Sequence, residues 1–377
     1  MNSSPFSFVE KDKRSKGDDR VRASVLWAAL WLLVLGGLVA CGNPALPAAT
    51  LPSDNPPVGA EVPSAPQKED EPPSLPPDPE NRRLVELGLR PYPEEVEKGP
   101  LPANEKGRIM VLMYHRITDD GKDQRWTRTP DDFRKDLEAL YERGYRPINA
   151  SQLVDGDWDV PPGYTPVVLT FDDSTPGQLA FTPGDPPQSL EEAVARLDPH
   201  SAVGILVAFH QEHPDWKLRA TFFVNGNALF GVPEEGTIKL QLLDALGFEI
   251  GNHTFSHASL KSISAEATVK EMGLNQKVVQ EAVPGYRMRT LALPYGIWPR
   301  HLDEAIAGTY EGVPYRNEAF FLVGSHPTVP PGDPRFDPYR IPRIQVVDES
   351  LKLDTTFPYT WLTYFDKHPE ERFVKGE

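Results

Sequence analysis

The stretch "PVVLTFDD", residues 166–173, decides the fold class of this chain. It is a nearly continuous apolar run, and two aspartates, Asp172 and Asp173, close it. Apolar runs without alternation are typical of parallel strands that are buried on both faces. We therefore predict a buried parallel strand here, with two carboxylates at its C-terminal end.

Strands and helices alternate along the rest of the chain. Further strands are predicted at 108–115, 218–226, 248–253, 289–296 and 319–326, and helices at 129–144, 201–214, 237–247, 264–282 and 300–308. This alternation is typical of βα units around a parallel sheet. In a barrel built from such units, the residues that carry chemistry gather at the C-terminal ends of the strands.

Polar side chains stand at the ends of four predicted strands. The aspartate pair ends one strand, and His253 and His257 follow a second. Tyr295 follows a third in "LALPYG", and His115 ends the strand at 108–115. This placement is expected if the residues form a single site at one edge of the sheet, and it is not expected if they lie in unrelated surface loops.

The two histidines in "GNHTFSH", residues 251–257, have the spacing of two ligands of one metal ion. Residues four apart share a face if the backbone turns helically. In the H-E-x-x-H pattern of zinc proteases a glutamate follows the first histidine, but Thr254 stands there in this chain. Carboxylates must therefore come from elsewhere. The aspartate pair can supply one ligand and one general base, in either order.

Three motifs in this order, "TFDDS", "HTFSH" and "LALPYG", resemble those of the polysaccharide deacetylases, the nodulation-type carbohydrate esterases. The resemblance covers roughly residues 108–347. It implies a distorted (β/α) barrel with parallel strands and a bound divalent metal, with zinc as the expected ion. It also implies an enzyme that removes acetyl groups from N-acetylated sugars, or O-acetyl groups from xylan.

The same resemblance assigns roles to five residues. Asp173, His253 and His257 would bind the metal, and Asp172 would be the general base. The backbone N–H of Tyr295 would help to hold the oxyanion.

The chain departs from the family's pattern at several positions. Ser174 stands where a glycine is usual, and Ala292 stands where an arginine commonly pairs with the catalytic aspartate. Some exopolysaccharide deacetylases also lack this arginine. The late histidine that serves as general acid has no clear match. His326 is the candidate, and an ordinary loop histidine is the alternative. Arg340 and Arg343 either pair with site carboxylates or are solvated at the surface.

The N-terminal segment has the marks of an export signal. A charged start precedes the uncharged apolar run 23–40, and the only cysteine, Cys41, ends "LVAC". This resembles the lipobox of bacterial lipoproteins, so we expect a signal peptide at 1–41 with a lipidated Cys41. An uncleaved transmembrane anchor is the alternative. In both cases the protein is expected on the outer face of the bacterial cytoplasmic membrane.

A proline-rich segment follows the expected lipidation site. Residues 43–80 contain 12 prolines and no aromatic residue. Such a composition cannot bury a core. We predict a disordered tether at 42–107 and a deacetylase-like catalytic domain at 108–377.

The composition restricts the partners. The formal net charge is −16, which argues against nucleic acid and fits a neutral polymer or a cationic product. We expect an acetylated polysaccharide as substrate, a membrane contact through the lipid anchor, and a monomer. Trp126, Phe181 and Trp298 either stack on sugar rings or pack in the interior.

The function expected from these observations is a metal-dependent hydrolase that removes acetyl groups from N-acetylated sugars of a cell-envelope or extracellular polysaccharide. Two alternatives remain open: an O-acetyl xylan-type esterase, and a catalytically weakened glycan-binding protein on the same fold.

Overall fold

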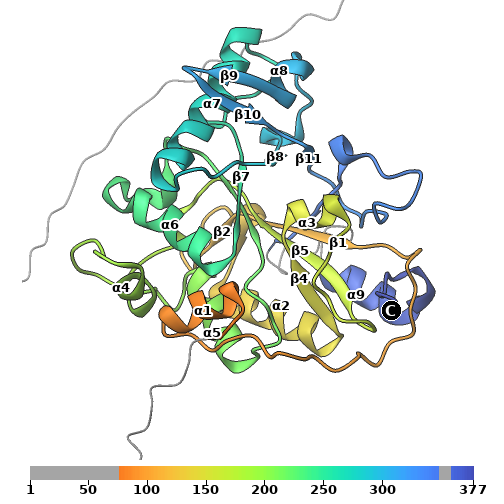
Figure 1. Cartoon of the computed structure of the whole chain (residues 1–377). Helices are drawn as coiled ribbons and strands as arrows, with labels where there is room; N and C mark the ends of the chain where they lie inside the picture. The colour runs from red at the N-terminus through yellow and green to blue at the C-terminus, as the bar shows by residue number, and fades with distance from the viewer. Residues whose placement is uncertain (1–75, 348–357) are drawn as a thin grey trace, which may run out of the picture. The chain divides into compact units, whose positions relative to one another are not determined.

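A sheet of eight parallel strands forms the centre of this computed structural model, which describes residues 76–347 and 358–377 (Figure 1). The strand order is β11-β8-β7-β6-β5-β1-β12, and β4 pairs with β5 as well. The strands are β1 (Met110–Tyr114), β4 (Tyr145–Ile148), β5 (Thr165–Phe171), β6 (Thr221–Val224), β7 (Glu249–Asn252), β8 (Thr290–Ala292), β11 (Ala319–Phe321) and β12 (Ile344–Gln345).

The apolar run that starts at residue 166 forms β5, as predicted. It pairs with β1 from Met110↔Val167 to Tyr114↔Phe171, and every residue of both strands is buried. On its other side, β5 pairs first with β4 and then, at Thr170↔Thr221, with β6. Burial on both faces explains why the run contains no alternation of polar and apolar residues.

The two ends of the sheet approach each other. Isolated parallel bridges join Phe321 to Ile341 and Gly324 to Ile344, and Leu322 N donates a hydrogen bond of 2.9 Å to Ile341 O. The sheet is therefore curled into a distorted barrel, which confirms the predicted fold class. All of its strands point in one direction, so their C-terminal ends lie at one rim.

Helices surround the sheet. The five predicted helices are confirmed as α2 (Pro130–Glu142), α5 (Ala202–Glu212), α6 (Gly236–Leu246), α7 (Ala265–Ala282) and α8 (Leu302–Ile306). Local capping sets their ends: the Thr129 side chain accepts a hydrogen bond from Asp132 N, and that of Ser264 accepts one from Ala267 N. Gly247 ends α6 in the left-handed conformation, at φ 88°.

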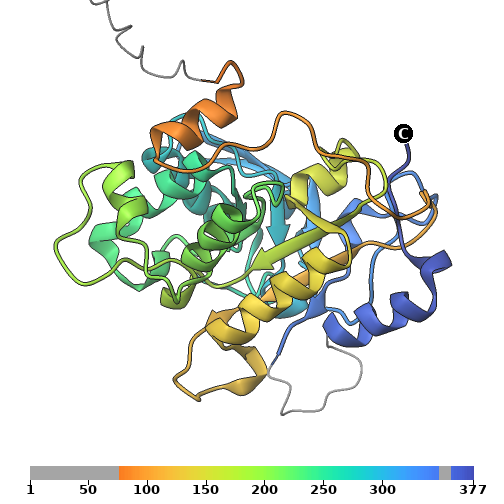
Figure 2. The same cartoon turned by 90° about the horizontal axis from the view of Figure 1, so that it is seen from below.

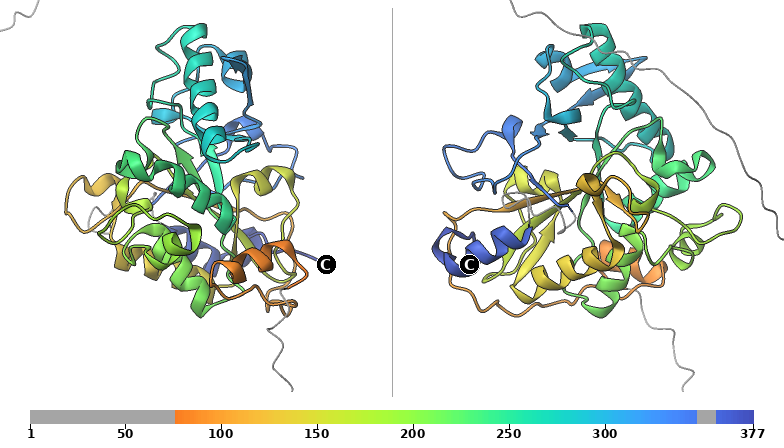
Figure 3. Two further views of the ribbon diagram at one scale, coloured as in Figure 1. Left: turned by 60° about the vertical axis from the view of Figure 1, so that its left-hand side comes forward. Right: turned by 180° about the vertical axis from the view of Figure 1, so that it is seen from behind.

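Several elements were not predicted. They are the helices α3 (Ala150–Asp155), α4 (Leu190–Ala195) and α9 (Pro358–Lys367), the strands β4 and β12, the parallel pair β2 (Arg116–Ile117) and β3 (Thr127–Arg128), and the antiparallel hairpin β9 (Ala307–Tyr310) and β10 (Val313–Arg316). The hairpin packs on α7, and with α8 these elements form the upper part of Figure 1, as both views in Figure 3 show.

The folded domain begins earlier than predicted, because part of the proposed tether packs on it. Helix α1 (Pro79–Glu86) is capped by Asp78, and Leu84 is buried in the core. Three further apolar residues of this segment, Leu87, Leu89 and Tyr92, are buried as well. Proline richness masked these residues in the sequence, so the boundary at residue 108 is wrong.

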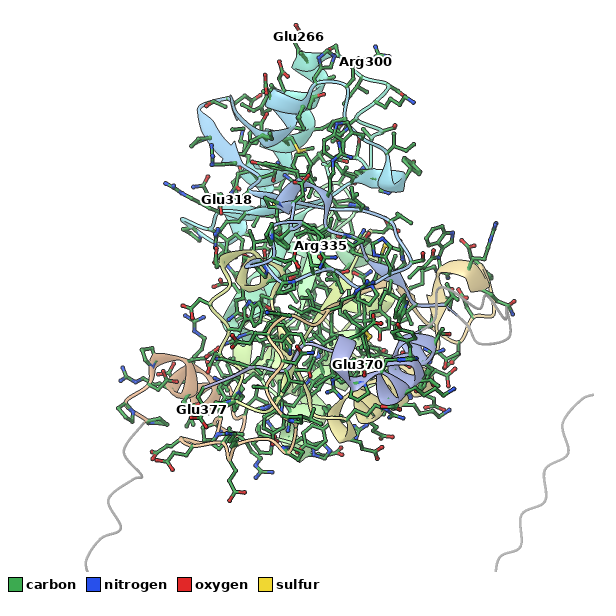
Figure 4. All side chains as sticks on the ribbon, turned by 90° about the vertical axis from the view of Figure 1, so that its right-hand side faces the viewer. Glu266, Arg300, Glu318, Arg335, Glu370 and Glu377 are labelled. Carbon is green, nitrogen blue, oxygen red and sulfur yellow. The ribbon has the colours of Figure 1, made fainter. Side chains whose placement is uncertain are left out.

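From α1 the chain crosses one side of the domain to reach β1 (Figure 2). The C-terminal residue Glu377 lies against this segment (Figure 4), with Lys98 Nζ 2.6 Å from its Oε1. The predicted signal peptide, Cys41 and the tether up to residue 75 lie outside the described residues. Within 76–347 and 358–377, no helix combines the length and the apolar character needed to cross a membrane.

Candidate metal centre and active site

One carboxylate and two imidazoles meet beyond the C-terminal ends of β5 and β7. His253 Nε2 lies 3.2 Å from Asp173 Oδ1, and His257 Nε2 lies 3.3 Å from the same oxygen. The three potential ligand atoms all lie within 4.8 Å of one another. Ligands held at about 2.1 Å in a tetrahedron around zinc are about 3.4 Å apart, so this donor set fits a divalent ion. The structure thus brings together the three ligands that the resemblance implied.

A left-handed turn aims Asp173 at the histidines. Strand β5 ends at Phe171, and Asp173 and Ser174 then adopt φ values of 76° and 49°. This conformation is unfavourable for residues other than glycine and persists only where the surroundings hold it. Ser174 Oγ accepts a hydrogen bond of 3.0 Å from Asn225 N, and its carbonyl oxygen accepts one from Phe230 N. A serine can therefore occupy this position because its hydroxyl helps to hold the turn.

The histidine pair does not lie on a helical turn, contrary to the expectation from its spacing. The segment after β7 is a loop in which Thr254 and His257 have φ values of 63° and 57°. Asn225 Nδ2 donates hydrogen bonds to the carbonyl oxygens of His253 and Thr254, at 2.6 and 2.9 Å. The loop still places the two imidazole centroids 4.9 Å apart.

The first histidine is oriented by a backbone group. His253 Nδ1 lies 2.8 Å from Ala292 O at the end of β8. A carbonyl oxygen can only accept, so Nδ1 carries a hydrogen, and Nε2 is the ring nitrogen that remains available to a metal ion or to Asp173. The side chain is almost fully buried, so the imidazole has little freedom to turn away. This arrangement suits a metal ligand.

Asp172 points to a different partner. Arg343 Nη1 and Nη2 donate hydrogen bonds of 2.7 Å to Asp172 Oδ1 and Oδ2, respectively. Both side chains are buried. Of the two alternatives for Arg343, the pairing with a site carboxylate is therefore the observed one. Arg340, by contrast, is exposed beside Asp337.

The charges in this cluster shift the pKa values of its acidic groups. Burial alone would raise the pKa of Asp172, but the Arg343 guanidinium and His253 lower it below its usual value. Burial is likewise outweighed at Asp173, where the hydrogen bond and the charge of His253 lower the pKa strongly. Both carboxyl groups are therefore anionic at neutral pH, as a base and a ligand must be.

The pKa values of the two imidazoles shift in opposite directions. Burial alone would lower the pKa of His253, but the charge of Asp172 and the hydrogen bond to Asp173 raise it above its usual value. Burial, followed by the charge of His253, lowers the pKa of His257. His257 is therefore neutral at pH 7 and can act as a ligand without losing a proton.

His115 is a second basic side chain close to Asp172. Its Nε2 is 3.9 Å from Asp172 Oδ2, and burial lowers its pKa. Its Nδ1 is buried without a hydrogen-bond partner among the described residues. The ring of Trp126 packs against it at a centroid distance of 4.6 Å. Sequence reasoning favoured a structural role for His115, although its place at a strand end was a signal for the site.

These groups share one cavity of about 310 Å³. Its lining consists of His115, Arg116, Asp123, Trp126, Asp172, Asp173, Thr175, His253, His257, Leu293, Tyr295 and Val323. The cavity therefore contains Asp173, His253 and His257, which we call the metal-binding cluster because they could hold a metal ion. It also contains the arginine-paired Asp172, the buried His115 and apolar walls.

An exposed apolar surface borders the cavity at Tyr295. This residue has φ 62°, is 62% exposed, and its ring meets His257 edge-on at a centroid distance of 4.5 Å. Ile297 and Val323 are also exposed. We call Tyr295, Ile297 and Val323 the apolar lip. Among the described residues only five large hydrophobic side chains are exposed, and three of them form this lip.

Other sequence candidates lie outside the cavity. His326 is exposed and contacts the backbone of Pro327 through Nδ1, and it is not part of the cavity lining. Phe181 packs against the main core, and Trp298 packs on Phe320. Of the three aromatic residues considered for sugar stacking, only Trp126 lines the cavity.

Comparison with solved structures finds deacetylases. A polysaccharide deacetylase from Bacillus cereus is 18% identical, with a TM-score of 0.48 over 68% of this chain and 69% of that one. The deacetylase PplD of Streptococcus pyogenes, solved with acetate, is also 18% identical, with a TM-score of 0.46 over 67% of this chain and all of that one.

Two characterised proteins are more similar to this chain, but only over a short segment. Peptidoglycan-N-acetylmuramic acid deacetylase PdaC of Bacillus subtilis is 36% identical over 81 residues, 22% of this chain and 16% of PdaC. Chitin deacetylase 1 of Cryptococcus neoformans var. grubii is 33% identical over 92 residues, 24% of this chain and 18% of that protein. The chain thus spans less than a fifth of the length of either relative.

The match to a family falls in the same part of the chain. Residues 214–309 match the family described as polysaccharide deacetylase. This segment contains both histidines of the metal-binding cluster and Tyr295, while Asp172 and Asp173 precede it. The family match and the two related deacetylases agree in this part of the chain, which is therefore similar to polysaccharide deacetylases.

Proposed function

We propose that this protein is a metal-dependent deacetylase that hydrolyses N-acetyl groups of a cell-envelope or extracellular glycan. One observation carries the proposal: Asp173, His253 and His257 form a ligand set in the same cavity as the arginine-paired Asp172. The match of residues 214–309 to the polysaccharide deacetylase family supports the reaction class.

The metal is proposed on the chemistry of the three donors. Two imidazoles and one carboxylate are a donor set that zinc accepts, with room for further ligands from solvent or substrate. A divalent ion held there supplies Lewis acidity to the acetyl group and makes water easier to deprotonate. The protein groups around it then have the task of moving protons and orienting the substrate.

Asp172 is proposed as the general base. It is anionic, lines the cavity and keeps lone pairs that Arg343 does not use, so it can take the proton of the attacking water. The backbone N–H of Tyr295 is proposed to stabilise the negative charge that develops on the acetyl oxygen.

The proton for the leaving nitrogen is proposed to come from His115 rather than His326. Three histidines line the cavity, and His253 and His257 belong to the metal-binding cluster. His115 remains, and its Nε2 lies 3.9 Å from Asp172 Oδ2 in the same cavity.

The walls of the cavity support a sugar substrate. Aromatic rings present apolar faces on which the C–H groups of a pyranose ring can stack. Trp126 stands in the cavity wall and Tyr295 at the apolar lip. The relatives act on peptidoglycan N-acetylmuramic acid and on chitin, so N-acetylated amino sugars are the proposed substrate class.

Acetate release by the purified, zinc-loaded protein tests the proposal. Substrates should include peptidoglycan, chitin oligosaccharides and an O-acetylated xylan, so that amides and an ester are compared directly. We expect release from at least one N-acetylated glycan. Release from xylan alone would identify an esterase, and no release from any substrate would favour a glycan-binding protein.

The two adjacent aspartates should respond differently to substitution. Asp172→Asn is expected to keep the metal and to lower kcat by about 10²-fold or more, the effect of removing a general base. Asp173→Asn is expected to lower metal affinity, with activity partly recovered at high zinc concentration. Equal zinc affinity and activity in both variants would contradict these roles.

The site of action is proposed from the N-terminal sequence. A lipidated Cys41 would anchor the protein at the outer face of the bacterial cytoplasmic membrane, next to cell-envelope glycans. Metabolic labelling with a fatty-acid analogue should mark the wild-type protein and not Cys41→Ser. A labelled Cys41→Ser protein would contradict this anchor.

A further inference from the structure

The Arg343 guanidinium is held at several points. Besides its two hydrogen bonds to Asp172, Nη1 donates one of 3.1 Å to Thr170 Oγ1, and Nε donates one of 2.9 Å to Leu322 O. The side chain has no exposed surface. Its guanidinium carbon also lies 5.5 Å from the centroid of the Phe223 ring. The cation is therefore fixed in the barrel interior before any substrate arrives.

We propose that Arg343 is a positioning residue for the proposed general base. This inference rests on the proposed function. Two parallel N–H···O contacts fix both the position and the plane of the Asp172 carboxylate. The lone pairs that remain on the two oxygens then face directions set by the arginine, so one of them can point steadily at the attacking water.

The backbone around Arg343, which directly precedes β12, explains how the arginine can hold the Asp172 carboxylate in place. Arg343 lies between Ile341 and Ile344, which bridge to Phe321 and Gly324 across the closure of the barrel. Both bridging isoleucines are fully buried. The backbone on both sides of Arg343 is therefore held against β11 and the segment that follows it.

Among the described residues, no second arginine or lysine forms an ion pair with Asp172. Arg116, the other arginine of the cavity lining, pairs with Asp120. Without Arg343, the buried carboxylate would keep only His115 nearby, at 3.9 Å. A carboxylate with a single distant partner can rotate, and small displacements of a catalytic group cost large factors in rate.

The experiment compares Arg343→Ala, Arg343→Lys, Asp172→Asn and the double variant Asp172→Asn/Arg343→Ala in the full-length protein. We expect Arg343→Ala to lower kcat by about 10- to 100-fold, with KM and zinc content little changed, since the carboxylate acts on the reacting water. Arg343→Lys should recover only part of kcat, because an ammonium group makes one contact instead of two.

The double variant separates positioning from a general structural effect. If Arg343 acts through Asp172, the double variant should be no slower than Asp172→Asn alone. Arg146→Met is the matched control. Arg146 is a buried arginine that donates to Asp215 at 2.6 Å, and neither residue lines the active-site cavity. The control is expected to lower thermal stability and to keep kcat.

Three outcomes would overturn the inference. The first is an unchanged kcat in folded Arg343→Ala. The second is a double variant whose fold-decrease in kcat is the product of those of the two single variants. The third is a raised KM with an unchanged kcat in Arg343→Ala. If Arg343→Ala does not fold, Arg343→Lys decides, and wild-type kcat in that variant would refute the role. Acetate release by the wild-type protein tests the proposed function separately, so the two failures are distinguishable.

Discussion

Arg343 donates a hydrogen bond to each carboxylate oxygen of Asp172, although the two residues are 171 positions apart in the chain. The arginine stands next to the last strand of the barrel, and the aspartate follows its central strand. The position where the family resemblance implied an arginine holds the small, buried Ala292. Asp172 is thus still paired with an arginine, but this arginine comes from the segment next to β12 and not from the end of β8.

The metal-binding cluster predicts a clear effect of losing one imidazole. His257→Ala removes one of three ligands, so the zinc content of the purified protein should fall sharply and thermal stability should fall with it. Zinc content by atomic emission and thermal melting with and without added zinc measure this. His200→Ala, at an exposed histidine outside the cluster, is the control and should match the wild type. Full zinc occupancy in His257→Ala would contradict the site.

The proposed proton donor predicts different outcomes for two histidines. His115→Asn should lower kcat by about 10²-fold and keep zinc, because the leaving nitrogen loses its acid. His326→Asn should keep wild-type kcat, since His326 is exposed and outside the cavity lining. Steady-state kinetics with one N-acetylated substrate measure both. The reverse pattern would restore His326 as the acid.

Trp126 and the apolar lip predict an effect on substrate binding. Trp126→Ala and Tyr295→Ala should each raise KM by about 10-fold, which corresponds to about 1.4 kcal/mol for a lost aromatic contact with a sugar ring. The matched control is Trp298→Ala, where the ring packs on Phe320 outside the cavity. It should affect stability rather than KM. An equal KM in all three variants would exclude stacking at these positions.

A buried glutamate at the opposite end of β7 predicts a pH dependence of stability. Glu249 accepts hydrogen bonds from Ser151 N, Thr221 Oγ1 and Thr290 Oγ1. Burial nevertheless raises its pKa above the ordinary 4.5. The folded state therefore holds a proton that the unfolded state releases, and the free energy of unfolding falls as pH rises from 4.5 to the raised pKa.

Chemical denaturation at a series of pH values tests this sign. The Glu249→Gln variant has no ionisable group at this position, so its free energy of unfolding should decline less steeply than that of the wild type above pH 4.5. Parallel curves for the two proteins would show that Glu249 does not titrate differently in the folded and unfolded states.

The elements predicted well were those determined by local sequence. Strand β5 follows from one apolar run, and α2 follows from Thr129, Pro130 and the amphipathic pattern behind them. The metal-binding cluster was predictable because strand direction alone brings Asp173, His253 and His257 to one rim of the sheet. In each case the information lies within a few residues or in the order of the strands.

The features that were left open or misjudged depend on contacts between distant segments. Arg343 sits in "YRIPRIQV", and nothing within that stretch distinguishes it from the surface residue Arg340. Only the closure of the barrel turns one of them towards Asp172. The loop of the histidine pair was misjudged for a related reason, because Asn225 on another strand end holds it out of a helical turn.

Because the barrel closes beside β12, the residues of the site become available in a fixed order during synthesis. A chain emerges from its N-terminus, and domains assemble as their segments become available. Both aspartates, the histidine pair and Tyr295 all emerge before the segment with Arg343 does. A nascent chain would thus contain Asp173, His253 and His257 while Asp172 still lacked its arginine partner. Asp172 would therefore gain its cationic partner last, once the strand that closes the barrel has been synthesised.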